Sequence, residues 1–178
     1  MARTTPINSG YTILDCVDAN GSNGYRVDVW VEYRISNGML DAYFYAATKF
    51  GYSTSTSHTY GLNSTFRVGD NVSEISGGSY DFRSSGVVNL LGSYHGTIQE
   101  ACGGSDTVTI SGSFTTASTY ITGGSITGTV DVSAGLGNVY IHDGTSYQPY
   151  QVYIYDGESY SQYIPYIYNG STWEAYSG

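Results

Sequence analysis

The sequence predicts an all-β fold, and three observations lead to that prediction: the composition, the alternation of apolar residues and the turn clusters. The 178 residues include 24 Gly and 20 Tyr but only 3 Pro and 12% charged residues. Such a chain is poor in the straight-chain residues that favour helices and rich in residues that favour strands and turns. Short alternating segments separated by turn clusters are typical of a β-sandwich or a β-barrel.

The clearest predicted strand is 25–35, where apolar and charged side chains alternate as in a half-buried antiparallel strand. One face carries Val27, Val29, Val31, Tyr33 and Ile35, and the other carries Arg26, Asp28, Glu32 and Arg34, with Trp30 as the exception. Further strands are expected within 39–50, 64–70, 107–114 and 125–132, and turns at the clusters SNG (36–38) and SGG (76–78). No segment shows a sustained helical period.

The charge balance excludes some classes of partner. The formal net charge is −9, with 6 Lys and Arg against 15 Asp and Glu. Nucleic acid is therefore not an expected partner, because affinity for phosphates depends on basic side chains. No apolar run approaches the roughly 18 residues of a membrane span, so no membrane association is expected. The first residues show no secretory signal, and we expect synthesis in a cytoplasm.

The C-terminal part repeats one phrase of thirteen residues three times. The copies are VYIHDGTSYQPYQ (139–151), VYIYDGESYSQYI (152–164) and PYIYNGSTWEAYS (165–177). The composition changes just before them, at the AGLG stretch of 134–137. The sequence therefore predicts two parts, a β-sandwich over 1–134 and three tyrosine-rich hairpin repeats over 138–178.

Each repeat contains Asp-Gly or Asn-Gly, a dipeptide that accepts the positive φ of a two-residue hairpin turn. Turns of two residues would place Tyr140 opposite Tyr147 and Tyr153 opposite Tyr160, in a four-stranded meander. One aromatic row would then contain Tyr140, Tyr147, Tyr166 and Trp173, and a second would contain Tyr150, Tyr163 and Tyr176. Pro149 and Pro165 are unfavourable inside such strands, so the alternative is three separate hairpins that stack.

An uncovered aromatic row would exceed the apolar patch that monomers usually expose, so the sandwich itself or an identical neighbouring chain is expected to cover it. The predicted binding or assembly residues are Tyr140, Tyr147, Tyr150, Tyr153, Tyr160, Tyr163, Tyr166, Trp173 and Tyr176. Sugar stacking on the same rings is the alternative. Asp143, Asp156, Glu158 and Glu174 would then contact the sugar, and otherwise they serve as turn formers and a solubilising rim. Choline-binding repeats are longer and rich in Trp, and are a poorer comparison.

No catalytic residue, metal site or cofactor is predicted. His58, His95 and His142 lack the spacing of metal ligands, and no phosphate loop or nucleophile motif is present. Asp81 and Glu100 could form a carboxylate pair only if the fold brought them together. Cys16 and Cys102 are interpreted as reduced thiols, with a disulfide as the alternative.

Two stretches also resemble a known family. Residues 79–98 (SYDFRSSGVVNLLGSYHGTI) and 105–132 (SDTVTISGSFTTASTYITGGSITGTVDV) resemble an immunoglobulin-like module of minor tail and structural proteins of long-tailed phages. The phrase YIPYIYNGSTWEAY (163–176) is similar to the ending of many phage virion proteins.

This resemblance implies an immunoglobulin-like sandwich in a non-enzymatic virion protein of the tail or capsid surface, made in the cytoplasm of the host bacterium. Its partners would be other virion proteins, identical subunits and possible host surface polysaccharide. The alternative function is a carbohydrate-binding module that uses the tyrosine-rich face.

Overall fold

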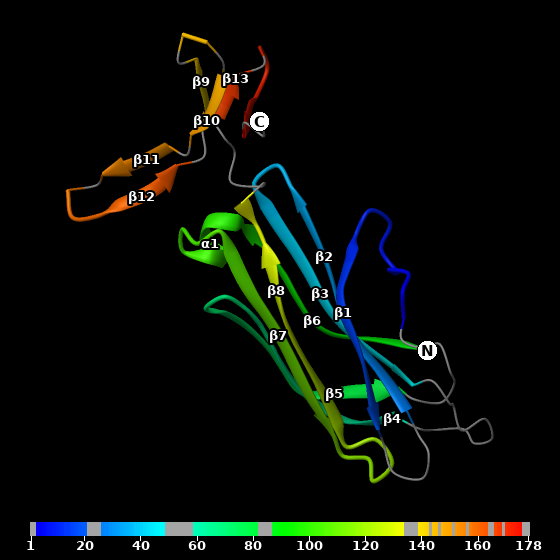
Figure 1. The fold of residues 1–178 in the computed structure, drawn as a ribbon. Helices are drawn as coiled ribbons and strands as arrows, with labels where there is room; N and C mark the ends of the chain where they lie inside the picture. Colours follow the sequence, from blue (N-terminus) through cyan, green and yellow to red (C-terminus); the bar gives the residue numbers. More distant parts are fainter. Residues whose placement is uncertain are drawn as a thin grey trace.

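The computed structural model describes residues 3–20, 26–48, 59–81, 87–133, 139–142, 144–145, 147–150, 152–155, 157–163, 166–168 and 170–175. Two antiparallel sheets of four strands each face one another, and the three hairpins follow them in the chain (Figure 1). The predicted all-β sandwich is therefore confirmed.

The first sheet, sheet A, has the strand order β1-β2-β3-β6. Its strands are β1 (Thr12–Asn20), β2 (Arg26–Ser36), β3 (Met39–Thr48) and β6 (Val88–Thr97). The second sheet, sheet B, has the order β5-β4-β7-β8. Its strands are β4 (Thr59–Val68), β5 (Asn71–Asp81), β7 (Thr107–Thr116) and β8 (Gly123–Asp131). At the two margins of the sandwich, β1 lies beside β8 and β5 lies beside β6.

The strand order does not reproduce the immunoglobulin order that the resemblance implied. An immunoglobulin constant domain pairs its strands as A-B-E-D and C-F-G, so its third strand lies in the opposite sheet from its first two. Here β1, β2 and β3 form a continuous meander in sheet A, and the chain crosses to sheet B only after β3. The long β2–β3 hairpin holds the third strand in the first sheet, where its buried face completes the core.

One predicted turn cluster is confirmed and the other is wrong. Asn37 and Gly38 both have positive φ, 53° and 72°, as a two-residue turn between β2 and β3 requires. The cluster SGG at 76–78 lies inside β5 instead. There Ser76 and Gly77 of β5 face the single residue Asn63 of β4, between the pairs Leu62–Gly78 and Ser64–Ile75, so β5 carries a bulge with Gly77 at φ 70°. Glycine in a strand often marks such a bulge, and here it does not end the strand.

The main core lies between the sheets and is centred on two phenylalanine–glycine pairs. Phe44 of β3 is paired with Gly92 of β6 in sheet A, and Phe66 of β4 is paired with Gly112 of β7 in sheet B. The two rings stack at 5.8 Å between centroids. A Cβ on Gly92 would lie 2.4 Å from the Cβ of Phe66, and one on Gly112 would lie 2.8 Å from the ring of Phe44. Each glycine therefore provides the space for the opposite sheet's ring.

A second, smaller cluster lies on the outer face of sheet A and explains why Trp30 interrupts the alternation. Trp30 is fully buried there with Tyr45 and Ala47, and its ring stacks on that of Tyr45 at 5.4 Å. Glu32, predicted to lie on an exposed polar face, is also fully buried. The polar face of β2 is covered because residues 3–11 lie across it, as their contacts with Trp30 and Glu32 show.

A short helix, α1 (Ile98–Cys102), follows β6 directly. Thr97 caps it: its side chain accepts from the Glu100 amide, and the Glu100 carboxylate accepts from the Thr97 amide. Ile98 and Ala101 are buried against the core. Five residues are too few for a periodic pattern, so the sequence did not predict this helix.

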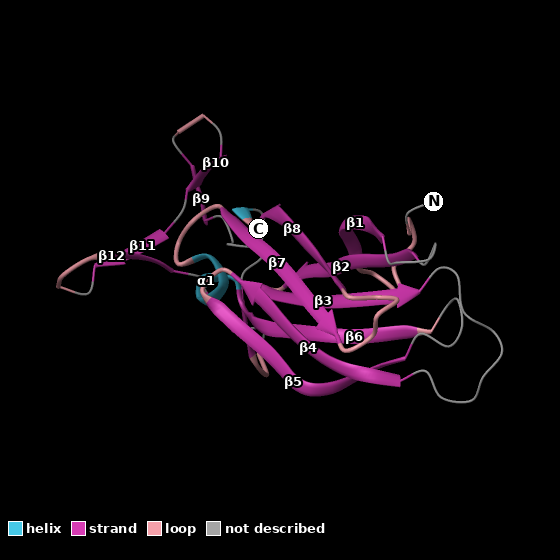
Figure 2. Cartoon of the chain, turned by 90° about the horizontal axis from the view of Figure 1, so that it is seen from below, coloured by secondary structure: helices cyan, strands magenta, loops and turns pink. Residues whose placement is uncertain are grey.

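The repeats form three separate two-stranded sheets, each a hairpin. Their strands are β9 (Val139–His142), β10 (Tyr147–Tyr150), β11 (Val152–Tyr155), β12 (Tyr160–Tyr163), β13 (Tyr166–Tyr168) and β14 (Trp173–Ala175). They lie beyond the end of the sandwich that carries α1 and the end of β8 (Figures 1 and 2). The predicted boundary at 134–137 falls outside the described residues.

Candidate functional site

The three hairpins, β9–β10, β11–β12 and β13–β14, are called the tyrosine arm here. Their registers pair His142 with Tyr147, Tyr155 with Tyr160, and Tyr168 with Trp173 at the ends nearest the loops. Each loop therefore contains four residues, and an aromatic pair, or a His–Tyr pair in the first hairpin, closes it. The loop glycines have positive φ, between 101° and 108°, as predicted for Gly144, Gly157 and Gly170.

The predicted register of the repeats is wrong. Two-residue turns would have paired Tyr140 with Tyr147, but Tyr140 pairs with Pro149. In the second hairpin Tyr153 pairs with Gln162 and not with Tyr160. The predicted meander is absent among the described residues, because no ladder joins one hairpin to the next. The hairpins are separate, as the alternative has them, and their stacking on one another stays a prediction. No ladder among the described residues continues an aromatic row from one hairpin to the next.

The described side chains of the tyrosine arm are exposed. Tyr153, Ile154 and Tyr155 are consecutive in β11, yet all three are about half exposed, at 48, 49 and 54%. Tyr160 and Trp173 are 73 and 68% exposed, and Tyr166 is 51% exposed. A strand that covers a core would bury alternate residues. The pattern in β11 shows that the sandwich covers neither face of this hairpin.

Only some of the predicted arm residues can be placed as side chains. Tyr155 and Tyr160 contact each other, with ring centroids 4.9 Å apart and the planes tilted by 38°. The Tyr155 hydroxyl donates to the carbonyl of Gly157 at 2.8 Å, across the loop. The side chains of Tyr140, Tyr147, Tyr150 and Tyr163 are not described, and Tyr176 lies outside the described residues, as do Asp143 and Asp156.

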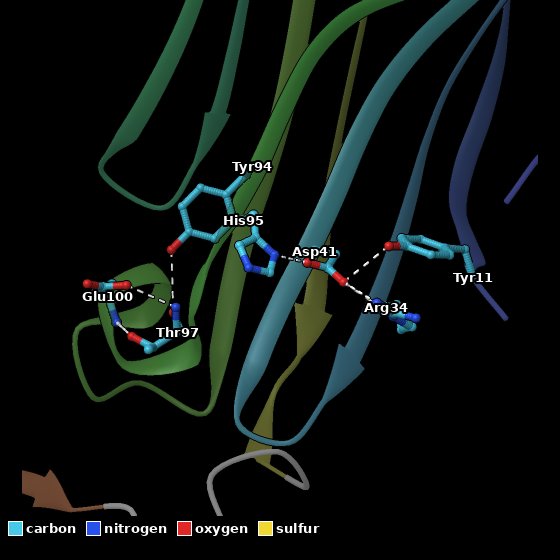
Figure 3. A network of polar contacts seen from close by, with 7 residues as sticks. All are labelled: Tyr11, Arg34, Asp41, Tyr94, His95, Thr97 and Glu100. Carbon is cyan, nitrogen blue, oxygen red and sulfur yellow. Dashed lines mark hydrogen bonds and ion pairs between the residues drawn. The ribbon is translucent and has the colours of Figure 1, made fainter. Parts of the chain in front are cut away.

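A second polar site lies on the outer face of sheet A, and the sequence did not predict it. Arg34, Asp41 and His95 occupy one row across β2, β3 and β6, because Arg34 pairs with Asp41 and Asp41 pairs with His95. Arg34 Nη2 donates to Asp41 Oδ2 at 2.7 Å, and His95 Nδ1 contacts Asp41 Oδ1. The Tyr11 hydroxyl donates to Asp41 Oδ2 at 3.1 Å (Figure 3).

The electrostatics of this row follow from the burial of Asp41, which is 5% exposed. Burial alone would raise the pKa of its carboxyl, but the hydrogen bonds from His95, Arg34 and Tyr11 outweigh it and leave the pKa below its usual value. Burial and the neighbouring carboxylate raise the pKa of Tyr11 to about 12. The row thus holds an ionised carboxylate between an arginine and a histidine, with Tyr11 as an additional donor.

The same N-terminal segment is fixed at a second buried carboxylate. Glu32 accepts from the amides of Ile7 and Asn8, at 2.6 and 3.0 Å, and from Trp30 Nε1 at 2.9 Å. The side-chain amide of Asn8 also donates to it, at 2.9 Å. Glu32 and Asp41 therefore attach residues 7–11 to sheet A. Residues 7–11 show no strand pattern, so the sequence did not predict that they attach to sheet A.

In the part of the chain that the structure describes, the remaining candidate residues are not brought together in one site. Asp81 ends β5, whereas Glu100 lies beside Asn71 at the start of that strand, so the two carboxylates are not brought together. Cys16 and Cys102 pack against different clusters and form no disulfide with each other. His58 lies outside the described residues. Within the part that the structure describes, no group of three or more His, Cys, Asp or Glu is placed to hold a metal ion.

Among the described residues, no helix combines the length and apolar character needed to cross a membrane. Comparisons with known proteins add no relationship: no protein-family model matches the chain, and no curated protein or solved structure matches it.

Proposed function

We propose that this protein is a non-enzymatic structural component of a bacteriophage virion, on the tail or capsid surface, and that the tyrosine arm makes its assembly contacts. Partners are identical subunits and other virion proteins. The observation that carries the proposal is the exposure of Tyr153, Tyr155, Tyr160, Tyr166 and Trp173 on hairpins outside the sandwich.

Assembly explains this exposure better than a solitary role. Isolated two-stranded hairpins are marginally stable in water, and strands of three or four residues are at the short end of the usual range. A partner that packs on the rings supplies the missing burial, and Tyr and Trp are enriched where interfaces contribute most of their binding energy. The resemblance of 79–98, 105–132 and 163–176 to phage structural proteins supports the virion as the setting.

The test is sedimentation velocity of the full chain over a range of concentrations, alone and with disrupted virions. A variant with Tyr155→Ser, Tyr160→Ser and Trp173→Ser removes exposed rings without touching the core. A matched control replaces the exposed Val72 and Leu90 of the sandwich by Ser. We expect self-association or virion binding that the arm variant abolishes and the control retains. A monomer that binds no virion component, with or without the rings, would exclude the proposal.

A carbohydrate-binding module is the second candidate, and one observation favours it. Tyr155 and Tyr160 form an exposed tilted pair of rings beside the exposed Glu158 of the same loop, a combination suited to stacking a sugar and hydrogen-bonding its hydroxyls. Glycan arrays distinguish the two functions. Binding of neutral glycans that Tyr160→Ala abolishes would favour this candidate, and an array without signal would exclude it.

A further inference from the structure

Arg67 stands apart from the other arginines that the structure describes. Arg26 pairs with Asp18 and Arg34 pairs with Asp41, while the guanidinium of Arg3 lies over the ring of Trp30. Arg67 is exposed on the outer face of sheet B and makes no ion pair or hydrogen bond with any described residue. In a chain with 15 carboxylates and 6 basic residues, an arginine that pairs with no described carboxylate is notable.

The surroundings of Arg67 form a hollow of about 340 Å³. Two rows of the sheet cross it: Arg67–Ser111–Thr127 and Thr65–Ser113–Ser125, each running over β4, β7 and β8. The rows are about 7 Å apart, since they are two residues apart along the strands. The side chains beside Arg67 are short, which leaves the space open, and Val17 of β1 also lines the hollow.

The lining determines which ligand chemistry fits. Each Ser and Thr hydroxyl can both donate and accept, as sugar hydroxyls do. The planar guanidinium matches a carboxylate with two parallel hydrogen bonds. Drug-like or peptide ligands usually need apolar anchors, whereas Val17 and Ile126 are the apolar side chains lining this hollow. Its volume is within the usual range of small-molecule sites, about 300–1,000 Å³.

We propose that this hollow binds an acidic sugar, with the sugar carboxylate on Arg67 and the sugar hydroxyls on Ser111, Ser113 and Thr127. A uronic acid residue of a polysaccharide has this chemistry. Glu74 lies on the same face but lines an adjacent hollow with Thr65 and Ser113, so it repels a second negative charge there and orients the ligand carboxylate toward Arg67. The proposal depends on this surface and not on the tyrosine arm.

The experiment titrates the full chain with trigalacturonate, its methyl ester, inorganic phosphate or a tetraglutamate peptide. Amide chemical shifts and calorimetry detect the binding. We expect trigalacturonate to shift the amides of Ser111, Ser113 and Thr127 and to bind at least about tenfold more tightly than the ester. Arg67→Gln should reduce the affinity about tenfold or more, and the matched control Arg26→Gln should leave it unchanged. Ser111→Leu, which keeps the charge but fills the hollow, should also weaken sugar binding.

Three results would overturn the proposal. Absence of any shift at these residues would exclude the site. Phosphate binding as tightly as trigalacturonate, unaffected by Ser111→Leu, would reduce the hollow to a simple anion site. Tetraglutamate binding with equal affinity would assign it to acidic protein segments.

Discussion

The sandwich and the tyrosine arm contain the same type of turn dipeptide but form different turns. In the sandwich, Asn37-Gly38 makes a two-residue turn, and Ser36 pairs directly with Met39. In the arm, each Asp-Gly or Asn-Gly begins a loop of four residues, as the pairing of Tyr155 with Tyr160 shows. The dipeptide therefore marks the position of a hairpin but does not by itself fix the loop length.

Burial of the flanking strands accounts for the different loop lengths in the sandwich and in the tyrosine arm. In the β2–β3 hairpin the register is tied to a buried face, with Val29, Val31 and Leu40 fully buried. In the arm the register differs from the predicted one by two residues, and a shift of two residues keeps every side chain on the same face of the strand. Since Tyr153, Ile154 and Tyr155 are all about half exposed, no buried face of β11 ties this hairpin to one register.

The largest expected effect is on the sandwich core. Gly92→Ala places a Cβ 2.4 Å from the Cβ of Phe66, an atom close to the backbone that cannot move aside easily. We expect a loss of about 3 kcal/mol in the free energy of unfolding, at the upper end of overpacking costs. Urea denaturation measures it, and Gly77→Ala, at an open position with positive φ, provides a milder control. Equal losses for the two variants would contradict the interlocked packing of Phe66 on Gly92.

The next effect concerns the attachment of the N-terminal segment at Glu32. Glu32→Gln replaces an accepting oxygen by an NH₂ group among N–H donors, so at least one buried donor loses its partner. We expect a cost of about 2 kcal/mol and faster hydrogen exchange at Ile7 and Asn8. The control is Glu74→Gln on exposed β5, which should change stability by less than about 0.5 kcal/mol. Unchanged exchange at Ile7 would show that Glu32 does not hold the segment.

The lowered pKa of Asp41 makes the stability of the folded protein depend on pH. Its pKa in the folded protein is below the value in the unfolded chain, so its stabilising contribution is present above the unfolded pKa and is lost as the pH falls through the folded pKa. Asp41→Asn should cost about 1–2 kcal/mol at neutral pH, because Arg34 and His95 remain partly solvated. It should also reduce the loss of stability on acidification below about pH 4. Denaturation midpoints across pH measure both effects, and parallel pH profiles for the two proteins would contradict the role of Asp41.

The smallest effect on global stability is expected in the arm. Gly157→Val places a β-branched residue at φ 108°, which disfavours the β11–β12 loop. The thermal midpoint of the sandwich should not change, because the hairpin shares no ladder with it. Glu158→Thr, one residue further on, should affect neither region. A fall of several degrees in the midpoint for Gly157→Val would show that the arm and sandwich unfold together.

The sequence predicted the strands in which apolar and polar residues alternate and the apolar residues are the buried ones. Val27, Val29 and Val31 are buried as expected, and so are Val108, Ile110 and Phe114 of β7. It could not predict that Glu32 would be buried, since the donors that satisfy it come from residues 7 and 8, and it gave no signal for the Asp41 row. That row combines residues from β2, β3 and β6, which only the sheet pairing brings together.

Amide hydrogen exchange of the full chain, at concentrations below and above self-association, tests most directly whether the arm needs a partner that the sandwich does not. In the dilute monomer, amides of Val152–Tyr155 and Tyr160–Tyr163 should exchange at least about a thousandfold faster than those of Val29 and Phe44, since a lone hairpin opens at little cost. They should gain protection on assembly, while the sandwich amides stay unchanged. Equal protection of arm and sandwich in the dilute monomer would contradict the proposal that assembly stabilises the tyrosine arm.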